Sequence, residues 1–294
     1  MTQSYENAKS RLNNITSIKP LLSALRTLSM GTWQMALNKL SKMHQFQEQF
    51  DQILAKILPK INENQLRRQP KNHKVLAEVD TILLIIGTER GLCGKFNKSL
   101  AENAITWIGS QKFPSYQIWA LGSRIIREIE RLGVELSWQK SLLTSDVASY
   151  QAAYQNTQNW LVQYESFNFN RVFIIYNELV NGQTSFTTYQ LLPYEIQPLT
   201  QIEKADLSWP PPIIETEPMG IYHQIIEHYF ASSFYQILLK SAIAEHSTRF
   251  SLMQESIDNA DEIIEELQLI INAERKKQIT QEMQELATGA GMID

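Results

Sequence analysis

MQESIDNADEIIEELQLII, residues 253–271, decides the fold, because its apolar residues step by four and three in turn over nearly three heptads. This spacing indicates a helix with a narrow apolar seam, as in a coiled coil, rather than the broader apolar face of a globular helix. After Ile271 the rhythm skips one residue, which alters supercoiling locally without ending the helix. The seam positions are Met253, Ile257, Ala260, Ile264, Leu267 and Ile271, followed by Ile279, Met283, Leu286 and Ala290.

Outward from this stretch, both ends of the chain read as long helices. Residues 219–287 contain one candidate helix breaker, Gly220, which lies at the start. Residues 5–58 repeat the 4-3 rhythm, with Gln47 at one seam position, and Pro59 ends the pattern because proline cannot continue the helical hydrogen bonds. At 1.5 Å per residue the two helices would be roughly 80 and 100 Å long, far beyond ordinary globular helices.

The two helices are predicted to pair with each other. The first is rich in lysine and arginine, whereas the run DNADEIIEEL makes the second acidic, and the matching seams must supply most of the stability. An antiparallel arrangement, with residues 40–54 alongside the earlier part of the last helix, lets the middle of the chain stay compact. The alternative is two separate amphipathic helices packed on the middle domain.

Between the helices the pattern changes to alternating strands and helices. TILLIIG (81–87), YQIWALG (116–122) and RVFIIYNEL (171–179) read as strands, and SFTTYQLLPYE after the Asn181-Gly182 turn reads as an antiparallel partner. The fold class is therefore α/β, with a long antiparallel coiled coil of the terminal helices and a small Rossmann-like domain. The expected divisions are residues 1–58, N-terminal helix; 75–195, α/β domain; 196–218, proline-rich connection; and 219–294, C-terminal helix.

Composition excludes several classes of function. The net charge of −4 gives no basic field for nucleic acid, and the single cysteine, Cys93, permits neither an internal disulfide nor a cysteine-based zinc site. The first residues lack the apolar core of a signal peptide, and no apolar run is long enough to span a bilayer. Any contact with a membrane is expected to be indirect.

The loop GTERGLCGKFN, residues 87–97, follows a buried strand and invites a test for phosphate binding. A P-loop needs glycine where Glu89 stands and a hydroxyl residue where Phe96 stands, so this reading fails. Cys93 has no histidine nearby in sequence and is expected to be a small buried spacer rather than a nucleophile. No metal-ligand spacing or carboxylate pair occurs either, so we expect no active site and no cofactor in this chain.

The same loop and the end of the chain resemble the γ subunit of rotary ATP synthases. The family shows Ser-Asp-Arg-Gly-Leu-Cys-Gly-Gly-Phe-Asn where residues 88–97 read TERGLCGKFN. It shows Arg-Gln-Ala-x-Ile-Thr-x-Glu where residues 275–282 read RKKQITQE, with a Gly-Ala pair following at 289–290. Glu245, Arg249 and the Asn259-Ala260 pair match a further block, so the resemblance spans the chain.

The chain departs from the family pattern at several positions. Pro20 stands where the family has an uninterrupted helix, so it should kink or start one; Lys276 replaces a glutamine, and Lys95 replaces a glycine. The segments LLPYE and WPPP resemble the γ subunits of second, often sodium-associated, ATPase operons.

The resemblance implies a non-catalytic rotor subunit that couples ion flow to ATP synthesis or hydrolysis. Its implied partners are the α and β subunits, the ε subunit and the membrane ring of c subunits, at the cytoplasmic face of a plasma membrane or at a thylakoid membrane. The implied contact residues are Arg249, Arg275, Thr280 and Glu282 on the last helix, with Arg90 and Lys95 on the 87–97 loop. A small α/β enzyme and a coiled-coil adaptor remain the alternatives, and the coupling ion, H⁺ or Na⁺, stays open.

Overall fold

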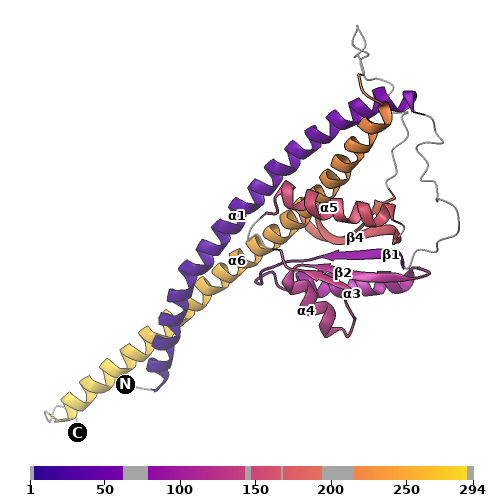
Figure 1. Ribbon diagram of the computed structural model, residues 1–294. Coiled ribbons are helices and arrows are strands. Elements are labelled where there is room, and N and C mark those ends of the chain that lie inside the picture. The colour runs from indigo at the N-terminus through magenta and orange to yellow at the C-terminus, as the bar shows by residue number, and fades with distance from the viewer. Residues whose placement is uncertain (1–2, 62–78, 143–146, 167, 194–214, 290–294) are drawn as a thin grey trace. The chain divides into compact units, whose positions relative to one another are not determined.

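The computed structural model describes residues 3–61, 79–142, 147–166, 168–193 and 215–289 (Figure 1). The chain divides into two compact units. One contains residues 1–31 and 249–294, and the other contains residues 32–248. The predicted connection 196–218 lies largely outside the described residues, as does most of the C-terminal tip.

Helix α1, Gln3–Ile57, and helix α6, Pro218–Gly289, each contribute to both units. Helix α1 ends just before Pro59, as the sequence predicted, and a short 3₁₀ turn, η1, Leu58–Lys60, follows it directly. Helices α1 and α6 are 55 and 72 residues long, which fits the unbroken apolar rhythm at both ends of the chain.

Pro20 lies inside α1 and does not start a new helix, contrary to one of the two expectations for it. The neighbouring side chains make local contacts and one contact with α6 at this point. Thr16 and Ser17 donate to the carbonyls of the residues four positions before them, each at 2.8 Å, and Lys19 forms an ion pair with Asp261 of α6. Helix α1 therefore continues through Pro20, although proline cannot donate a backbone hydrogen bond.

In each unit the described parts of α1 and α6 run antiparallel. In the first unit Lys19 contacts Asp261 and Arg26 contacts Gln254, so the numbering falls on one helix as it rises on the other. In the second unit Gln47 contacts Gln236, and Leu54 shares a buried cluster with Ile225. The antiparallel prediction, with residues 40–54 alongside the early part of the last helix, is confirmed.

The second unit contains a five-stranded sheet in the order β3-β2-β1-β4-β5. Strands β1 to β4 are parallel to one another, and β5 is antiparallel to β4 at one edge. The strands are β1, Val79–Ile86; β2, Tyr116–Leu121; β3, Trp138–Lys140; β4, Phe169–Val180; and β5, Gln183–Leu192. Asn181 (φ 51°) and Gly182 (φ 78°) form the β4–β5 turn, because both positions need a left-handed backbone.

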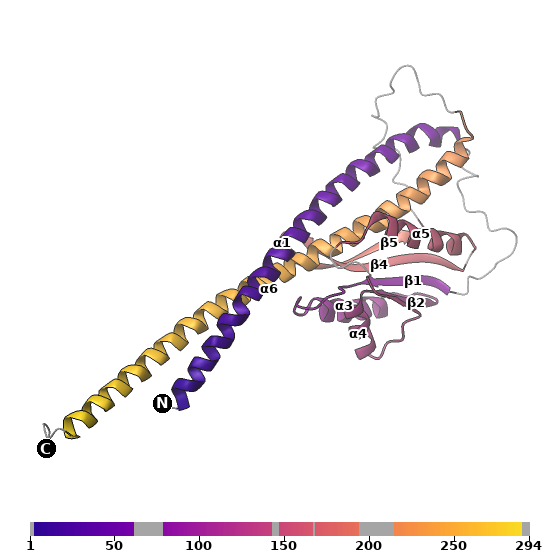
Figure 2. The ribbon, with the colours of Figure 1, turned by 60° about the vertical axis from the view of Figure 1, so that its left-hand side comes forward.

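Helices cover both faces of this sheet (Figures 1 and 2). Helices α3, Phe96–Ser110, and α4, Ser123–Arg131, lie on one face, and α5, Tyr150–Glu165, lies on the other. Because side chains alternate along a strand, β1 supplies both cores. Leu83 and Ile85 pack with α3 and α4, whereas Ile82, Leu84 and Ile86 pack in the core that includes α5 and α6.

Two details differ from the sequence-based expectation. Strand β3 was not predicted, because three residues carry no usable periodicity. The sequence shows a helical pattern over residues 147–167, but helix α5 begins at Tyr150, three residues later, since the hydroxyl of Ser149 caps it by accepting from the amide of Ala152 at 3.2 Å. The predicted fold class, a Rossmann-like α/β domain with a long antiparallel helix pair, is confirmed.

Candidate functional site

The 87–97 loop leaves the carboxyl end of β1 and is held by reciprocal hydrogen bonds. Asn97 accepts from the amide of Thr88 at 2.9 Å and donates from its side-chain amide to the Thr88 hydroxyl, also at 2.9 Å. The Thr88 hydroxyl in turn donates to the carbonyl of Arg90 at 2.7 Å. Thr88 and Asn97 are both buried, so the loop starts and ends on a fixed polar pair.

The glycines of this loop have different reasons to be glycine. Gly87, Gly91 and Gly94 follow a strand in a tight loop, which predicts backbone angles that side chains oppose. Gly94 (φ 53°) takes such a left-handed backbone, but so does the non-glycine Leu92 (φ 65°). Gly87 is needed for space, because a Cβ there would lie 2.4 Å from Cβ of Ile125 in α4. Gly91 shows no such constraint: the nearest atom to a Cβ would be 3.4 Å away, in the Arg124 side chain. The expectation of backbone freedom thus holds at Gly94 only.

Glu89 occupies the position at which an α/β protein of this kind often binds an anionic ligand. Its Oε2 accepts from the amide of Ser123, the first residue of α4, at 3.0 Å, and from the amide of Leu142 at 2.9 Å. Its Oε1 accepts from the Ser123 hydroxyl. Burial acts to raise the pKa of Glu89, but these hydrogen bonds and the charge of Arg124 outweigh it, so its pKa lies below the usual value.

The space at this end of the sheet is small. A cavity of about 40 Å³, lined in part by Glu89, Arg90 and Glu245, has room for about one to three water molecules. A wider cleft of about 680 Å³ lies between α5 and strands β2 and β3, and Lys140 is the one ionisable side chain among its described lining residues. Within the described ranges no three side chains of histidine, cysteine, aspartate or glutamate gather as metal ligands. None of these features provides a catalytic set of residues.

Cys93 is buried, with 3% of its surface exposed, and packs with Phe96 and with Ala244 of α6. Its thiol donates to the carbonyl of Gly91 at 3.5 Å. This is the environment of a space-filling residue beneath a turn, as predicted from the sequence.

Arg90 and Lys95 are both exposed and lie on the same short loop, so the structure brings these two predicted contact residues together. The other four lie on α6 in the first unit. Arg249 differs from the rest, because only 6% of its surface is exposed.

Arg275, Thr280 and Glu282 are exposed on the last part of α6. Arg275 and Glu282 are seven residues apart and share a face of the helix, whereas Thr280 is rotated by about 140° from Arg275. The hydroxyl of Thr280 donates to the carbonyl of Lys276 at 2.9 Å, and Glu282 accepts from Gln278 at 3.1 Å. The three therefore do not form one continuous patch.

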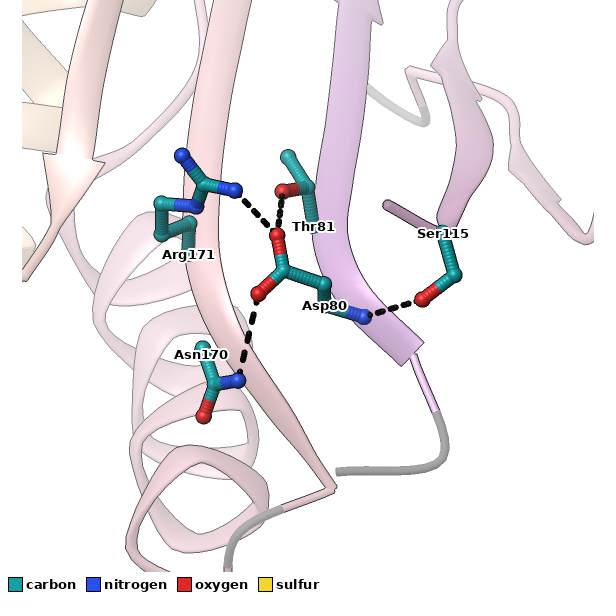
Figure 3. Close-up of polar contacts among 5 residues, drawn as sticks. All are labelled: Asp80, Thr81, Ser115, Asn170 and Arg171. Atoms are coloured by element: carbon teal, nitrogen blue, oxygen red, sulfur yellow. Dashed lines mark hydrogen bonds and ion pairs between the residues drawn. The ribbon is translucent and has the colours of Figure 1, made fainter. Parts of the chain in front are cut away.

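A polar cluster at the opposite end of the sheet was not anticipated (Figure 3). The carboxylate of Asp80 on β1 forms an ion pair with Arg171 on β4 and accepts from Asn170 at 3.2 Å and from Thr81 at 2.8 Å. Burial acts to raise the pKa of Asp80, but the hydrogen bonds from Arg171, Thr81 and Asn170 prevail, and its pKa is lowered. The amide of Asp80 also donates to the hydroxyl of Ser115 at 2.8 Å. The cluster joins the adjacent strands β1 and β4 and connects Asp80 to Ser115, the residue before β2.

The contacts of α6 with the α/β domain were not predicted either, because the residues that meet are far apart in sequence. Lys240 on α6 forms an ion pair with Glu178 on β4 at 2.9 Å, and Thr248 on α6 shares a hydrogen bond of 2.9 Å with Thr184 on β5. These contacts fix α6 to the sheet edge within the second unit.

Among the described residues, no helix combines the length and hydropathy that a membrane span requires.

Comparison with known proteins assigns the family. The ATP synthase family matches residues 4–292. The ATP synthase gamma chain of Glaesserella parasuis is 25% identical, over 94% of this chain and 98% of its own length. That of Fusobacterium nucleatum is 26% identical, over 97% and 98%.

Solved structures share the fold. The central stalk and c-ring structure of the Tetrahymena thermophila mitochondrial ATP synthase includes a chain with a TM-score of 0.55 and 19% identity, covering 80% of this chain and 98% of that one. A chain of the Euglena gracilis mitochondrial ATP synthase, in its OSCP/F1/c-ring structure, has a TM-score of 0.58 and 12% identity, covering 99% and 96%. With the family match over nearly the whole length, the chain belongs to the gamma-subunit family of ATP synthases.

Proposed function

We propose that this chain is the rotating central stalk of an ATP synthase and that it works at the cytoplasmic face of a plasma membrane or at a thylakoid membrane. In this role it couples transmembrane ion flow to ATP synthesis or hydrolysis in a ring of α and β subunits. The observation that carries the proposal is the antiparallel pair of α1 and α6, built from the two ends of a chain that matches the family over residues 4–292.

The helix pair has the physical properties that a rotating stalk needs. Helix α6 alone, with 72 residues, would be about 110 Å long. In the first unit the apolar residues Ile15 and Leu22 of α1 face Ala260 and Ile263 of α6 across a shared groove. The ion pair between Lys19 and Asp261 adds a polar contact that resists sliding. Two helices joined in this way resist bending better than one.

The contact residues are proposed on two surfaces. Arg275, Thr280 and Glu282, all exposed on α6, are proposed to meet the β subunits inside the ring. Their exposure leaves these side chains accessible to such a partner. Arg249 offers a partner little surface at 6% exposure, and we propose it as a minor contact.

The second surface is the 87–97 loop. Arg90 and Lys95 place two positive charges on one exposed turn, which suits acidic loops of the β subunits. The ε subunit and the c ring complete the proposed partners, so contact with a membrane comes through the complex. The α/β domain is proposed to be non-catalytic, because the cavity at the carboxyl ends of its strands measures about 40 Å³, too small for a nucleotide.

The test is assembly with purified α and β subunits of an ATP synthase. We expect one copy of this chain to co-elute with each α/β ring, and the ring's ATPase activity to become coupled to rotation or ion transport when the membrane part is supplied. Calorimetry of the chain alone with Mg-ATP should show no saturable heat. Failure to bind the ring, together with nucleotide binding by the isolated chain, would instead favour a small α/β enzyme.

A further inference from the structure

The carboxylate of Glu89 ties together three segments of the second unit. It accepts from both the amide and the hydroxyl of Ser123 at the start of α4, and from the amide of Leu142 just beyond β3. Glu89 itself follows the carboxyl end of β1. One side chain therefore connects the loop after β1 with two segments that lie 34 and 53 residues further along the chain.

A carboxylate from elsewhere is needed at α4 because the helix cannot cap itself. Its N-cap residue is Gly122, which has no side chain, and its first turn contains no acidic residue. A larger residue is excluded at this position, since Gly122 has φ 113° and a Cβ there would lie 2.8 Å from the carbonyl oxygen of Gly87. The backbone amide of Ser123 instead donates to Glu89, and the negative charge of Glu89 lies at the positive end of the helix dipole.

Arg90, the next residue, is held from both sides as a result. Its carbonyl accepts from the buried Thr88, and Glu89 is fixed to α4 and to Leu142. Further along the loop, Cys93 and Phe96 pack on Ala244 of α6. The loop is thus attached to α4 and the β3 end on one side and to α6 on the other, while Arg90 remains exposed.

We infer that Glu89 is a positioning residue, which locks the 87–97 loop to α4 so that Arg90 meets its partner from a fixed place. Force applied to Arg90 then passes into the sheet and α6 rather than bending the loop. This inference rests on the proposed function, since it takes the β-subunit contact of Arg90 as given. Glu89 does not touch the partner itself.

The lock is tested in the full-length chain by hydrogen exchange at single amides. Replacing Glu89 with glutamine keeps the size but removes the charge, so both backbone amides are left with a neutral oxygen acceptor, and the NH₂ group faces the Ser123 hydroxyl. We expect protection of these two amides to fall by about tenfold or more, the loss expected for a charge-assisted hydrogen bond. Glu89→Asp, which keeps the charge, should recover part of the protection. Glu130→Gln, an exposed change on the same helix, is the matched control and should change neither amide.

Positioning through Arg90 is tested in the assembled complex by a double-mutant cycle. Glu89→Gln and Arg90→Ala should each reduce ion transport per ATP hydrolysed, and the double variant should be no worse than Arg90→Ala. Glu89→Asp should restore coupling in proportion to the protection it restores.

Three results would overturn the inference: unchanged protection in Glu89→Gln, full coupling in that variant, or additive effects in the double variant. Because wild-type ring binding tests the proposed function separately, a chain that binds the ring but shows any of these three results refutes the positioning role alone. Loss of coupling in Glu89→Gln with intact amide protection would also refute it, since the lock would not then be the cause.

Discussion

Asp80 shows how a single carboxylate can hold two neighbouring strands together at one end of a sheet (Figure 3). Its ion pair with Arg171 and its bonds to Asn170 and Thr81 join β1 to β4, and its side chain keeps 22% of its surface exposed. Water therefore screens the pair, and its contribution to stability is modest.

Asp80→Asn is expected to lower the free energy of unfolding by about 1 kcal/mol at pH 7, after allowance for this screening. The pKa of Asp80 is lower in the folded chain than in the unfolded one. Its contribution is therefore present above the unfolded pKa, and it is lost as the pH falls through the folded value. Urea unfolding of the wild-type chain and of Asp80→Asn, from pH 7 down to pH 3, should show the difference in their free energies of unfolding shrinking below about pH 4. A difference that grows on acidification would contradict the assignment.

The second prediction for a single residue concerns Cys93. Cys93→Ser keeps a donor for the carbonyl of Gly91 and a side chain of similar size, so we expect a cost of about 1 kcal/mol or less and normal assembly. The chain has no second cysteine, so dithiothreitol should leave the ATPase activity of the complex unchanged. If the serine variant assembles but is inactive, the thiol has a chemical role that its burial does not suggest.

Between α1 and α6 of the second unit, a polar layer interrupts the apolar contacts. The side-chain amide of Gln236, which is only 8% exposed, donates to Gln47, and Gln47 also donates to Ser233 at 3.5 Å. On one side of this layer lies a buried apolar cluster that contains Leu54 and Ile225. A buried polar pair in such a seam costs stability but opposes a shift in register, because sliding would leave both amides unpaired.

Gln47→Ala is expected to lower the free energy of unfolding by about 1–3 kcal/mol, because it leaves the buried amide of Gln236 without this partner. Replacing Gln47 and Gln236 together by leucine should be close to neutral or stabilising. Thermal unfolding monitored by circular dichroism measures both. The double variant should also allow cysteine cross-links at shifted positions, whereas the wild-type register should give one set. An equal loss in the single and double variants would argue against a specific polar pair.

For the molecule as a whole, the decisive prediction concerns coupling. Replacing Arg275, Thr280 and Glu282 by alanine should leave α6 folded, because all three are exposed and alanine favours helix. The ATPase rate of the assembled complex should nevertheless fall, because the proposed hydrogen bonds to the β subunits are lost. Circular dichroism of the chain and steady-state ATPase of the complex measure the two effects.

Lys277→Ala with Gln281→Ala is the matched control, since both residues are exposed on the same segment and face other directions. Full coupled activity in the triple alanine variant would mean that Arg275, Thr280 and Glu282 simply face water.

Reversing the charges of Arg90 and Lys95 should also reduce coupling, because the reversed charges would repel the acidic loops rather than attract them.

The sequence by itself determined the long helices, four of the five strands and the antiparallel return of the chain. These follow from the period of 3.5 in residues 253–271, from short apolar, β-branched runs such as TILLIIG, and from the family motifs in residues 88–97 and 275–282. Pro59 and the Asn181-Gly182 turn were predictable because their backbone constraints are local. The same reading placed Arg90 and Lys95 on an exposed loop and Cys93 in a buried position.

Only the tertiary structure decided which distant residues meet. In the sequence Glu89 only rules out a P-loop, whereas in the folded chain it caps α4. Arg249 is buried, with 6% of its surface exposed. The tertiary structure also gave Leu92 a left-handed backbone, paired Gln47 with Gln236, and added β3 beside β2. The physical reason is that such contacts join residues tens to nearly two hundred positions apart. Their energies depend on how the folded chain brings side chains together, and no local period in the sequence records that.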